Sequence, residues 1–283
     1  MTNQNLEYEN SIKPKDTLFR LRLNEIWQYR DLLILFVQRD FVAKYKQTIL
    51  GPLWFFIQPI FQTIVLAIVF GGMAKLSTGG MPPVLFYLLG VTGWNYFSNC
   101  LRTTSNTFTV NASLFGKVYF PRAITPISII ISNLIQFGIG FILFLIIYAY
   151  FLFIGYPLKP NITLLLLPFL IIIMGLLGLG LGMLISALTT KYRDLQYLVE
   201  FGVQLLMYAT PVILPLSAIP SKYRIFMLVN PMTGVLETLK YGFFGTGTFS
   251  WELLGYSAVF MAVSFVVGLL VFNYTEKNFM DVV

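Results

Sequence analysis

The chain contains a series of apolar segments long enough to cross a lipid bilayer. A helix needs about 20 mostly apolar residues to span the hydrocarbon core, whereas a barrel strand alternates apolar and polar residues. The segments show no such alternation, and only 11% of the 283 residues are charged. We therefore predict an all-α membrane protein. The six predicted transmembrane helices cover residues 52–70, 84–101, 124–154, 162–188, 195–216 and 253–272.

The basic residues predict the orientation of these spans, because Lys and Arg are concentrated in the cytoplasmic loops of membrane proteins. With the N-terminus inside, most of the 19 basic residues flank inner ends of spans, whereas the outer segments hold few, among them Lys75, Lys159 and Lys240. Six spans then place both termini in the cytoplasm. The net charge of +7 is thus explained by topology, and nucleic-acid binding is not expected. The first 50 residues lack the pattern of a signal peptide and predict a cytoplasmic leader.

Two segments outside the spans have patterns of their own. Residues 24–50 mix apolar clusters with charges, which is typical of an amphipathic helix at the membrane surface. The alternative, a buried arm of a cytoplasmic domain, would need a second cytoplasmic segment to pack against. Residues 217–251 contain two apolar pieces too short to span, which predicts external re-entrant helices. The predicted organisation is a leader with the start of the interfacial helix (1–38), a membrane domain (39–276) and a cytoplasmic tail (277–283).

The sequence lacks residues that many enzyme mechanisms require. It has no histidine and a single cysteine, Cys100, so we expect no internal disulfide, no metal site and no His-based proton carrier. The phosphate-binding pattern Gly-x4-Gly-Lys-Ser/Thr is missing, which assigns any ATP and Mg²⁺ to a separate chain. A glycine-rich run lies inside the fourth span, where Gly178 and Gly182 predict close helix packing rather than dinucleotide binding.

Ionisable side chains inside a span indicate function, because a charge is costly to bury in hydrocarbon. The six predicted spans are nearly free of such side chains. Glu200 lies near the inner surface, where we expect snorkelling to the head groups or pairing with Lys191 or Arg193. Proton-coupled transport is therefore disfavoured.

Three stretches resemble the membrane subunits of bacterial type-2 ABC exporters for O-antigen, capsular polysaccharide and teichoic acid. Residues 39–54 (RDFVAKYKQTILGPLW) are similar to the family's interfacial helix leading into the first span. Residues 111–122 (NASLFGKVYFPR) resemble the cytoplasmic turn between spans two and three, except at Gly116, where a basic residue is more usual. Residues 192–232, with YRDL, YATPVI and NPM, resemble the fifth span and the external re-entrant helices.

The resemblance implies the permease subunit of an ATP-driven exporter in the bacterial cytoplasmic (inner) membrane. Its cargo would be a polyisoprenoid-diphosphate-linked glycan, with lipopolysaccharide O-antigen the leading candidate. The chain itself would hold no catalytic residue, and would form a homodimer docked on two copies of an ABC ATPase subunit. One alternative is a type-2 exporter of a drug, peptide or other cargo. The other is a membrane-embedded glycan-processing enzyme, which we would expect to show carboxylates, His or Arg at substrate depth.

Four groups of residues are expected to carry this function. Short cytoplasmic helices would transmit rigid-body movement from the ATPase. Basic residues after the interfacial helix would bind the lipid head group, unless they are ordinary positive-inside charges. Aromatic residues in the spans would present flat apolar faces to sugar rings, although most aromatic residues serve packing or the membrane belt. The coupling candidates are Asn111, Leu114, Lys117, Val118, Tyr119, Phe120, Pro121, Arg122, Arg193 and Asp194. The head-group candidates are Arg39, Lys44, Tyr45 and Lys46. The aromatic pathway candidates are Trp54, Phe55, Tyr87, Trp94, Tyr96 and Tyr208, and the re-entrant region holds Pro211, Asn230 and Pro231.

Overall fold

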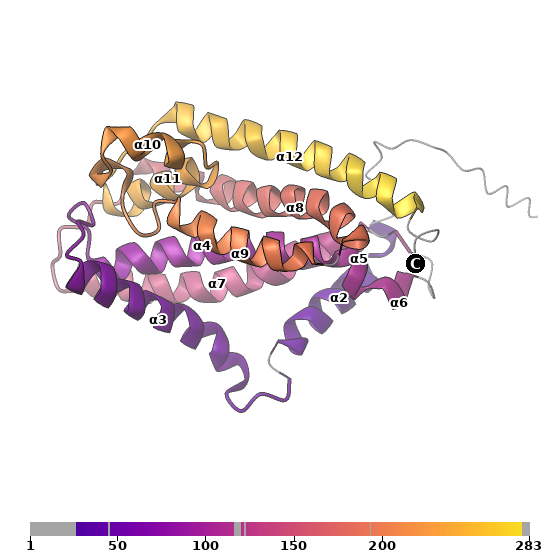
Figure 1. Cartoon of the computed structure of the whole chain (residues 1–283). Coiled ribbons are helices and arrows are strands. Elements are labelled where there is room, and N and C mark those ends of the chain that lie inside the picture. Colours follow the sequence, from indigo (N-terminus) through magenta and orange to yellow (C-terminus); the bar gives the residue numbers. More distant parts are fainter. Residues whose placement is uncertain (1–26, 45, 116–119, 122, 193, 279–283) are drawn as a thin grey trace, which may run out of the picture.

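A computed structural model (Figure 1) describes residues 27–278 except 45, 116–119, 122 and 193. Every regular element in this part of the chain is a helix, which confirms the predicted all-α class. In chain order the elements are α2 (Arg30–Ala43), η1 (Gly51–Leu53), α3 (Trp54–Leu66), η2 (Ala67–Met73), α4 (Pro83–Ser105), α5 (Thr107–Val110), α6 (Ala112–Phe115), α7 (Ile124–Phe153), η3 (Ile162–Leu166), α8 (Leu167–Lys191), α9 (Leu195–Tyr208), η4 (Leu216–Ala218), α10 (Ser221–Leu228), α11 (Met232–Phe244) and α12 (Trp251–Asn278).

Four helical segments of the described chain have the length and apolar character needed to cross a membrane. They are Gly51–Met73, Ile124–Phe153, Ile162–Lys191 and Trp251–Thr275, and they correspond to predicted spans one, three, four and six. Predicted span two is α4, a 23-residue helix whose side chains are mostly buried inside the bundle. Polar residues such as Thr92, Ser98 and Thr104 are among those buried there.

Predicted span five differs from the structure at its outer end. The expected helix over 195–216 is the 14-residue α9, which ends at Tyr208. The chain turns at Ala209, and Pro211 follows, which cannot donate a backbone hydrogen bond and disfavours helix in the residue before it. Residues 209–215 are thus a turn leading to the outer helices.

The centre of the fold is a layer formed by α4, α8 and α12, with α8 in the middle. Figure 1 shows α4, α7, α8 and α12 running side by side, α10 and α11 at one end of the bundle, and α5 and α6 at the other. Glycines allow the close contacts of α8. A Cβ atom at Gly178 would lie 2.7 Å from the carbonyl oxygen of Phe97 on α4, and one at Gly180 would lie 2.6 Å from the backbone nitrogen of Phe265 on α12. The predicted glycine packing is confirmed.

The expected interfacial helix is α2, which is shorter than the predicted segment 24–50. It packs against α7, and Figure 1 shows that it diverges from α3 in a V shape closed by the loop between them. Phe36 is buried, and the ring of Phe41 stacks on that of Phe55 with centroids 5.0 Å apart. Ile34 and Leu35 are exposed on its other side. One apolar side of the helix therefore packs on the bundle, and the other apolar side is exposed.

Candidate functional site

A polar cavity of about 410 Å³ lies within the bundle, between α3, α4, α7 and α9. We call it the amide cavity, because seven of its lining side chains are amides. These residues are Gln58, Gln62, Asn95, Asn99, Asn133, Gln136 and Gln204. Polar side chains are rare on membrane helices and usually serve a function there. This group of seven amides therefore makes the cavity a candidate ligand site or pathway.

Helical spacing explains why the amides meet. The pairs Gln58/Gln62 and Asn95/Asn99 are four residues apart, which places each pair on one helix face. Asn95 Nδ2 donates a hydrogen bond to Gln62 Oε1 at 3.1 Å, and this contact joins α4 to α3. Each amide offers a carbonyl acceptor and two N–H donors without a net charge. Such a surface can exchange hydrogen bonds with hydroxyl groups without holding any ligand by strong Coulomb attraction.

Lys44 reaches this cavity from the loop after α2. Its ammonium group donates to Asn133 Oδ1 at 3.1 Å and to Gln136 Oε1 at 2.8 Å, and both amides line the cavity. The side chain as a whole is exposed, but its ammonium group lies against two amides, and partial burial lowers the pKa of Lys44 from its ordinary value. Of the other head-group candidates, Lys46 is exposed and Tyr45 lies outside the described residues.

The six aromatic pathway candidates occupy different places. Phe55, Trp94 and Tyr96 line the amide cavity. Tyr87 is fully buried in the core and Trp54 is exposed. Tyr208 borders a separate apolar pocket of about 590 Å³ near α10. The structure thus brings three of the candidates to one site.

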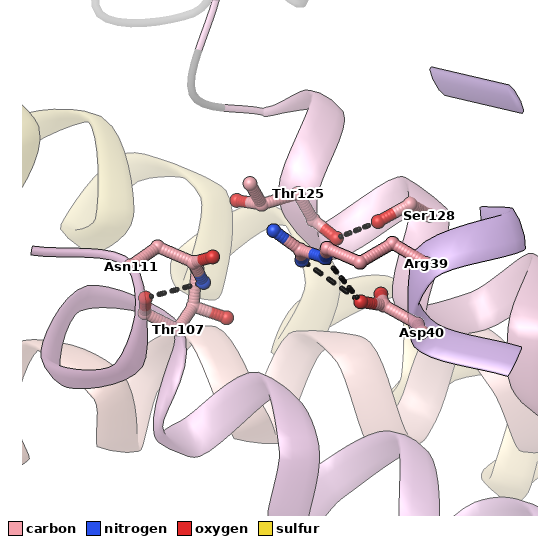
Figure 2. Close-up of polar contacts among 6 residues, drawn as sticks. All are labelled: Arg39, Asp40, Thr107, Asn111, Thr125 and Ser128. Carbon is pink, nitrogen blue, oxygen red and sulfur yellow. Dashed lines mark hydrogen bonds and ion pairs between the residues drawn. The ribbon is translucent and has the colours of Figure 1, made fainter. Parts of the chain in front are cut away.

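A second polar pocket, of about 280 Å³, lies at the end of the bundle that holds α5, and we call it the inner pocket after the predicted orientation. Figure 2 shows Arg39 and Asp40 on α2 extending toward Thr107 and Asn111, with Thr125 of α7 beside them. Arg39 Nη2 lies 2.8 Å from Asp40 Oδ1, so the charge of this head-group candidate is compensated within its own helix.

Arg102 lines both the inner pocket and the amide cavity. Its Nε lies 3.4 Å from Glu200 Oε2, and this ion pair bridges α4 and α9. Glu200 thus pairs with Arg102, a partner that the sequence did not predict. Arg193 lies outside the described residues, and Lys191 contacts the ring of Tyr192.

The described coupling candidates form a packed turn next to the inner pocket. Asn111 is buried, and its Nδ2 donates to the carbonyl oxygen of Thr107 at 2.9 Å. Phe120 packs on Phe36 of α2 with ring centroids 5.6 Å apart. The other described candidates are Leu114, which is partly buried against the same cluster, Pro121, whose carbonyl accepts from Ile124, and Asp194, which precedes α9. Lys117, Val118, Tyr119 and Arg122 lie outside the described residues.

Helix α11 carries two buried ionisable side chains that the sequence did not predict to be buried. Glu237 and Lys240 on α11 are 2% and 1% exposed, although Lys240 was counted among the outer-loop charges. Lys240 Nζ donates to the carbonyl oxygen of Pro211 and lies over the ring of Phe86 on α4. Asn230 Nδ2 donates to the carbonyl oxygen of Ala209 at 3.2 Å. Side chains from residues 230–240 thus hold the end of α9. We call Asn230, Glu237 and Lys240, with the turn that they contact, the outer clamp.

The re-entrant candidates meet in this clamp. Pro211 accepts from Lys240, Asn230 reaches the end of α9, and the carbonyl oxygen of Pro231 accepts from Ser257 Oγ on α12 at 2.6 Å. The described residues include no group of three His, Cys, Asp or Glu side chains placed to hold a metal ion.

The chain belongs to the ABC-2 type transporter membrane family, whose model matches residues 31–244. This confirms the resemblance found in the sequence. Among named relatives, it is 30% identical over 220 residues to the O-antigen export system permease protein RfbA of Myxococcus xanthus, covering 77% of this chain and 82% of the relative. It is 23% identical over 247 residues to the polysialic acid transport protein KpsM of Escherichia coli (84% and 91%). It is 22% identical over 251 residues to the capsule polysaccharide export inner-membrane protein CtrC of Neisseria meningitidis serogroup B (86% and 90%).

Proposed function

We propose that this chain is the permease subunit of an ATP-driven exporter that moves a lipid-linked polysaccharide, O-antigen first among the candidates, across the bacterial cytoplasmic membrane. The family and the names of its relatives, which are O-antigen and capsule export proteins, support this function. The structural observation that best supports this function is the amide cavity. Hydroxyl-rich cargo needs donors and acceptors along its path, and seven uncharged amides provide both.

In this proposal α4 and α9 complete a six-span topology with both termini in the cytoplasm. The V between α2 and α3 then lies at the inner surface, and α10 and α11 re-enter the membrane from outside. The lipid diphosphate approaches the inner surface near Lys44 and Lys46. Lys44 already lies against Asn133 and Gln136, so a head group that draws its ammonium away would free two cavity amides.

The proposal includes a homodimer on two ATPase subunits, with ATP and Mg²⁺ bound by those partners. The packed turn around Asn111 and Phe120 supports a coupling role, because it joins α4 to α7 and contacts α2 through Phe36. ATP binding can drive export only if the partner contacts one conformation of this turn more favourably than another. Asp194 would contribute from the start of α9.

Deletion of the gene in its host, followed by complementation, tests this function. We expect surface glycan to disappear and lipid-linked glycan to accumulate at the inner face of the membrane, with both effects reversed by the intact gene. Tagged protein should co-purify with an ABC ATPase encoded nearby. Unchanged surface glycan after deletion would refute the proposal, and loss of a different exported compound would point to another cargo.

A further inference from the structure

The inner pocket contains polar atoms that have no hydrogen-bond partner in the described part of the chain. Thr107 is 1% exposed, and its Oγ1 is unpartnered. The side-chain oxygen of Asn106 is also unpartnered. Both residues line the pocket, at the corner between α4 and α5. Because an unpaired buried polar group costs free energy, this corner is suited to a ligand that both donates and accepts hydrogen bonds.

The charges around the pocket indicate what kind of ligand fits. Two guanidinium groups, of Arg39 and Arg102, line it together with two carboxylates, of Asp40 and Glu200. The formal charges cancel, and each guanidinium already lies beside a carboxylate. A phosphate or diphosphate would meet two carboxylates as well as two guanidinium groups, so the pocket offers no net positive charge to attract it. The hydroxyl groups of a neutral sugar can instead donate to the carboxylates and to Asn106 and accept from the guanidinium groups.

The position and the volume of the inner pocket are compatible with a neutral sugar as its ligand. The volume of about 280 Å³ is near the lower end of small-molecule sites, which hold about 300–1,000 Å³. Arg102 forms part of the wall of both polar cavities, so a ligand in the inner pocket lies next to the amide cavity. Thr107 is also joined to the coupling turn, since its carbonyl oxygen accepts from Asn111.

We infer that the inner pocket is a binding site for one neutral sugar ring, held by Thr107, Asn106 and the Arg102–Glu200 pair before it passes Arg102 into the amide cavity. This inference rests on the proposed export of glycan and adds a separate cytoplasmic sugar site to it. Of the head-group candidates, Arg39 lines the pocket and is paired with Asp40, whereas Lys44 and Lys46 do not line it.

Saturation-transfer NMR on the intact permease–ATPase complex in lipid nanodiscs tests the inference. The probes are the methyl pyranosides of glucose, galactose and mannose. We expect at least one to bind the wild type, and Thr107→Val to weaken that binding by about three- to tenfold, as for the loss of one hydrogen bond. Thr107→Ser keeps the hydroxyl group and should bind normally. The matched control is Thr104→Val, because Thr104 is equally buried and unpartnered but does not line the pocket.

Three results would overturn the inference. They are absence of glycoside binding to the wild type, equal binding by wild type and Thr107→Val, and displacement of the glycoside by inorganic diphosphate. Each leaves the proposed function standing if gene deletion still abolishes surface glycan. Unchanged glycan after deletion would instead remove the proposed function itself.

Discussion

Glu237 and Lys240, one turn apart on α11, hold two different points of the segment that follows α9. Glu237 Oε1 accepts from the backbone N–H of Leu216 at 3.0 Å, and Lys240 donates to the carbonyl oxygen of Pro211. The second carboxylate oxygen accepts from Thr248 Oγ1 at 3.0 Å. This pair fixes the turn after α9 to α11 and to the loop before α12.

Removing the ammonium group of Lys240 should destabilise the protein. Lys240→Met leaves the carbonyl oxygen of Pro211 without this buried donor, which costs about 1–3 kcal/mol. We expect a lower thermal unfolding temperature of the purified complex. Lys222→Met, on exposed α10, is the control and should leave that temperature unchanged. Equal unfolding temperatures for both variants would show that the outer clamp contributes no stability.

If the amide cavity is part of the export pathway, loss of one of its amides should reduce export. Gln62→Met keeps the size of the side chain but removes its hydrogen bond with Asn95, so cargo hydroxyls lose a partner. We expect export to fall roughly two- to tenfold, the effect of about one hydrogen bond. Surface-glycan blotting at matched protein levels measures it. Val65→Met, on the exposed side of α3, is the control, and a similar fall in both variants would argue against a role for the cavity amides.

Lys44 makes stability depend on pH. Burial lowers its pKa in the folded protein below the ordinary value of 10.5, so folding disfavours its charged form. Below the folded pKa this penalty is fully present. As pH rises through the folded pKa toward 10.5, the unfolded state binds more protons, and stability increases. The unfolding temperature of the wild type should therefore rise relative to that of Lys44→Met over this window. A constant difference between the two proteins would contradict the lowered pKa of Lys44.

The glycines of α8 predict a sharp contrast between two alanine substitutions. A Cβ at Gly180 would lie 2.6 Å from the backbone nitrogen of Phe265, and backbone atoms cannot move aside as a flexible side chain can. We expect Gly180→Ala to destabilise by about 1–3 kcal/mol or more. Gly138 on α7 has no heavy atom within 4 Å of the same position, so Gly138→Ala should be neutral or stabilising. Chemical denaturation in detergent compares them, and similar losses would refute the packing explanation.

Much of the fold followed from local pattern. Long apolar runs predicted α7 to within one residue and η3 with α8 to within three, because hydropathy and length alone decide whether a helix can span. The run at 253–272 predicted α12, which begins two residues earlier and ends six residues later. The end of α9 was misplaced because residues 209–216 are as apolar as the helix before them. Their turn depends on hydrogen bonds from Asn230 and Lys240, which lie later in the chain.

The candidate site was less predictable, because it is built from contacts between distant segments. Glu200 pairs with Arg102, far from it in sequence, rather than with the nearer Lys191. The amides are neither charged nor aromatic, and the sequence prediction did not include them, although the spacing of Gln58 and Gln62 within an apolar span is a usable signal. Lys240 was assigned to an outer loop because short apolar pieces do not reveal whether they are buried.

The alternating glycines of α8 have a consequence for how the subunit can move. The backbone of α8 lies close to α4 at Gly178 and to α12 at Gly180, on two opposite sides, so rolling or sliding of α8 against either helix would bring main-chain atoms into contact. This close packing favours movement of the three helices as one body. Conformational change within the subunit would then involve the elements packed around them, such as α2, α3 and α9.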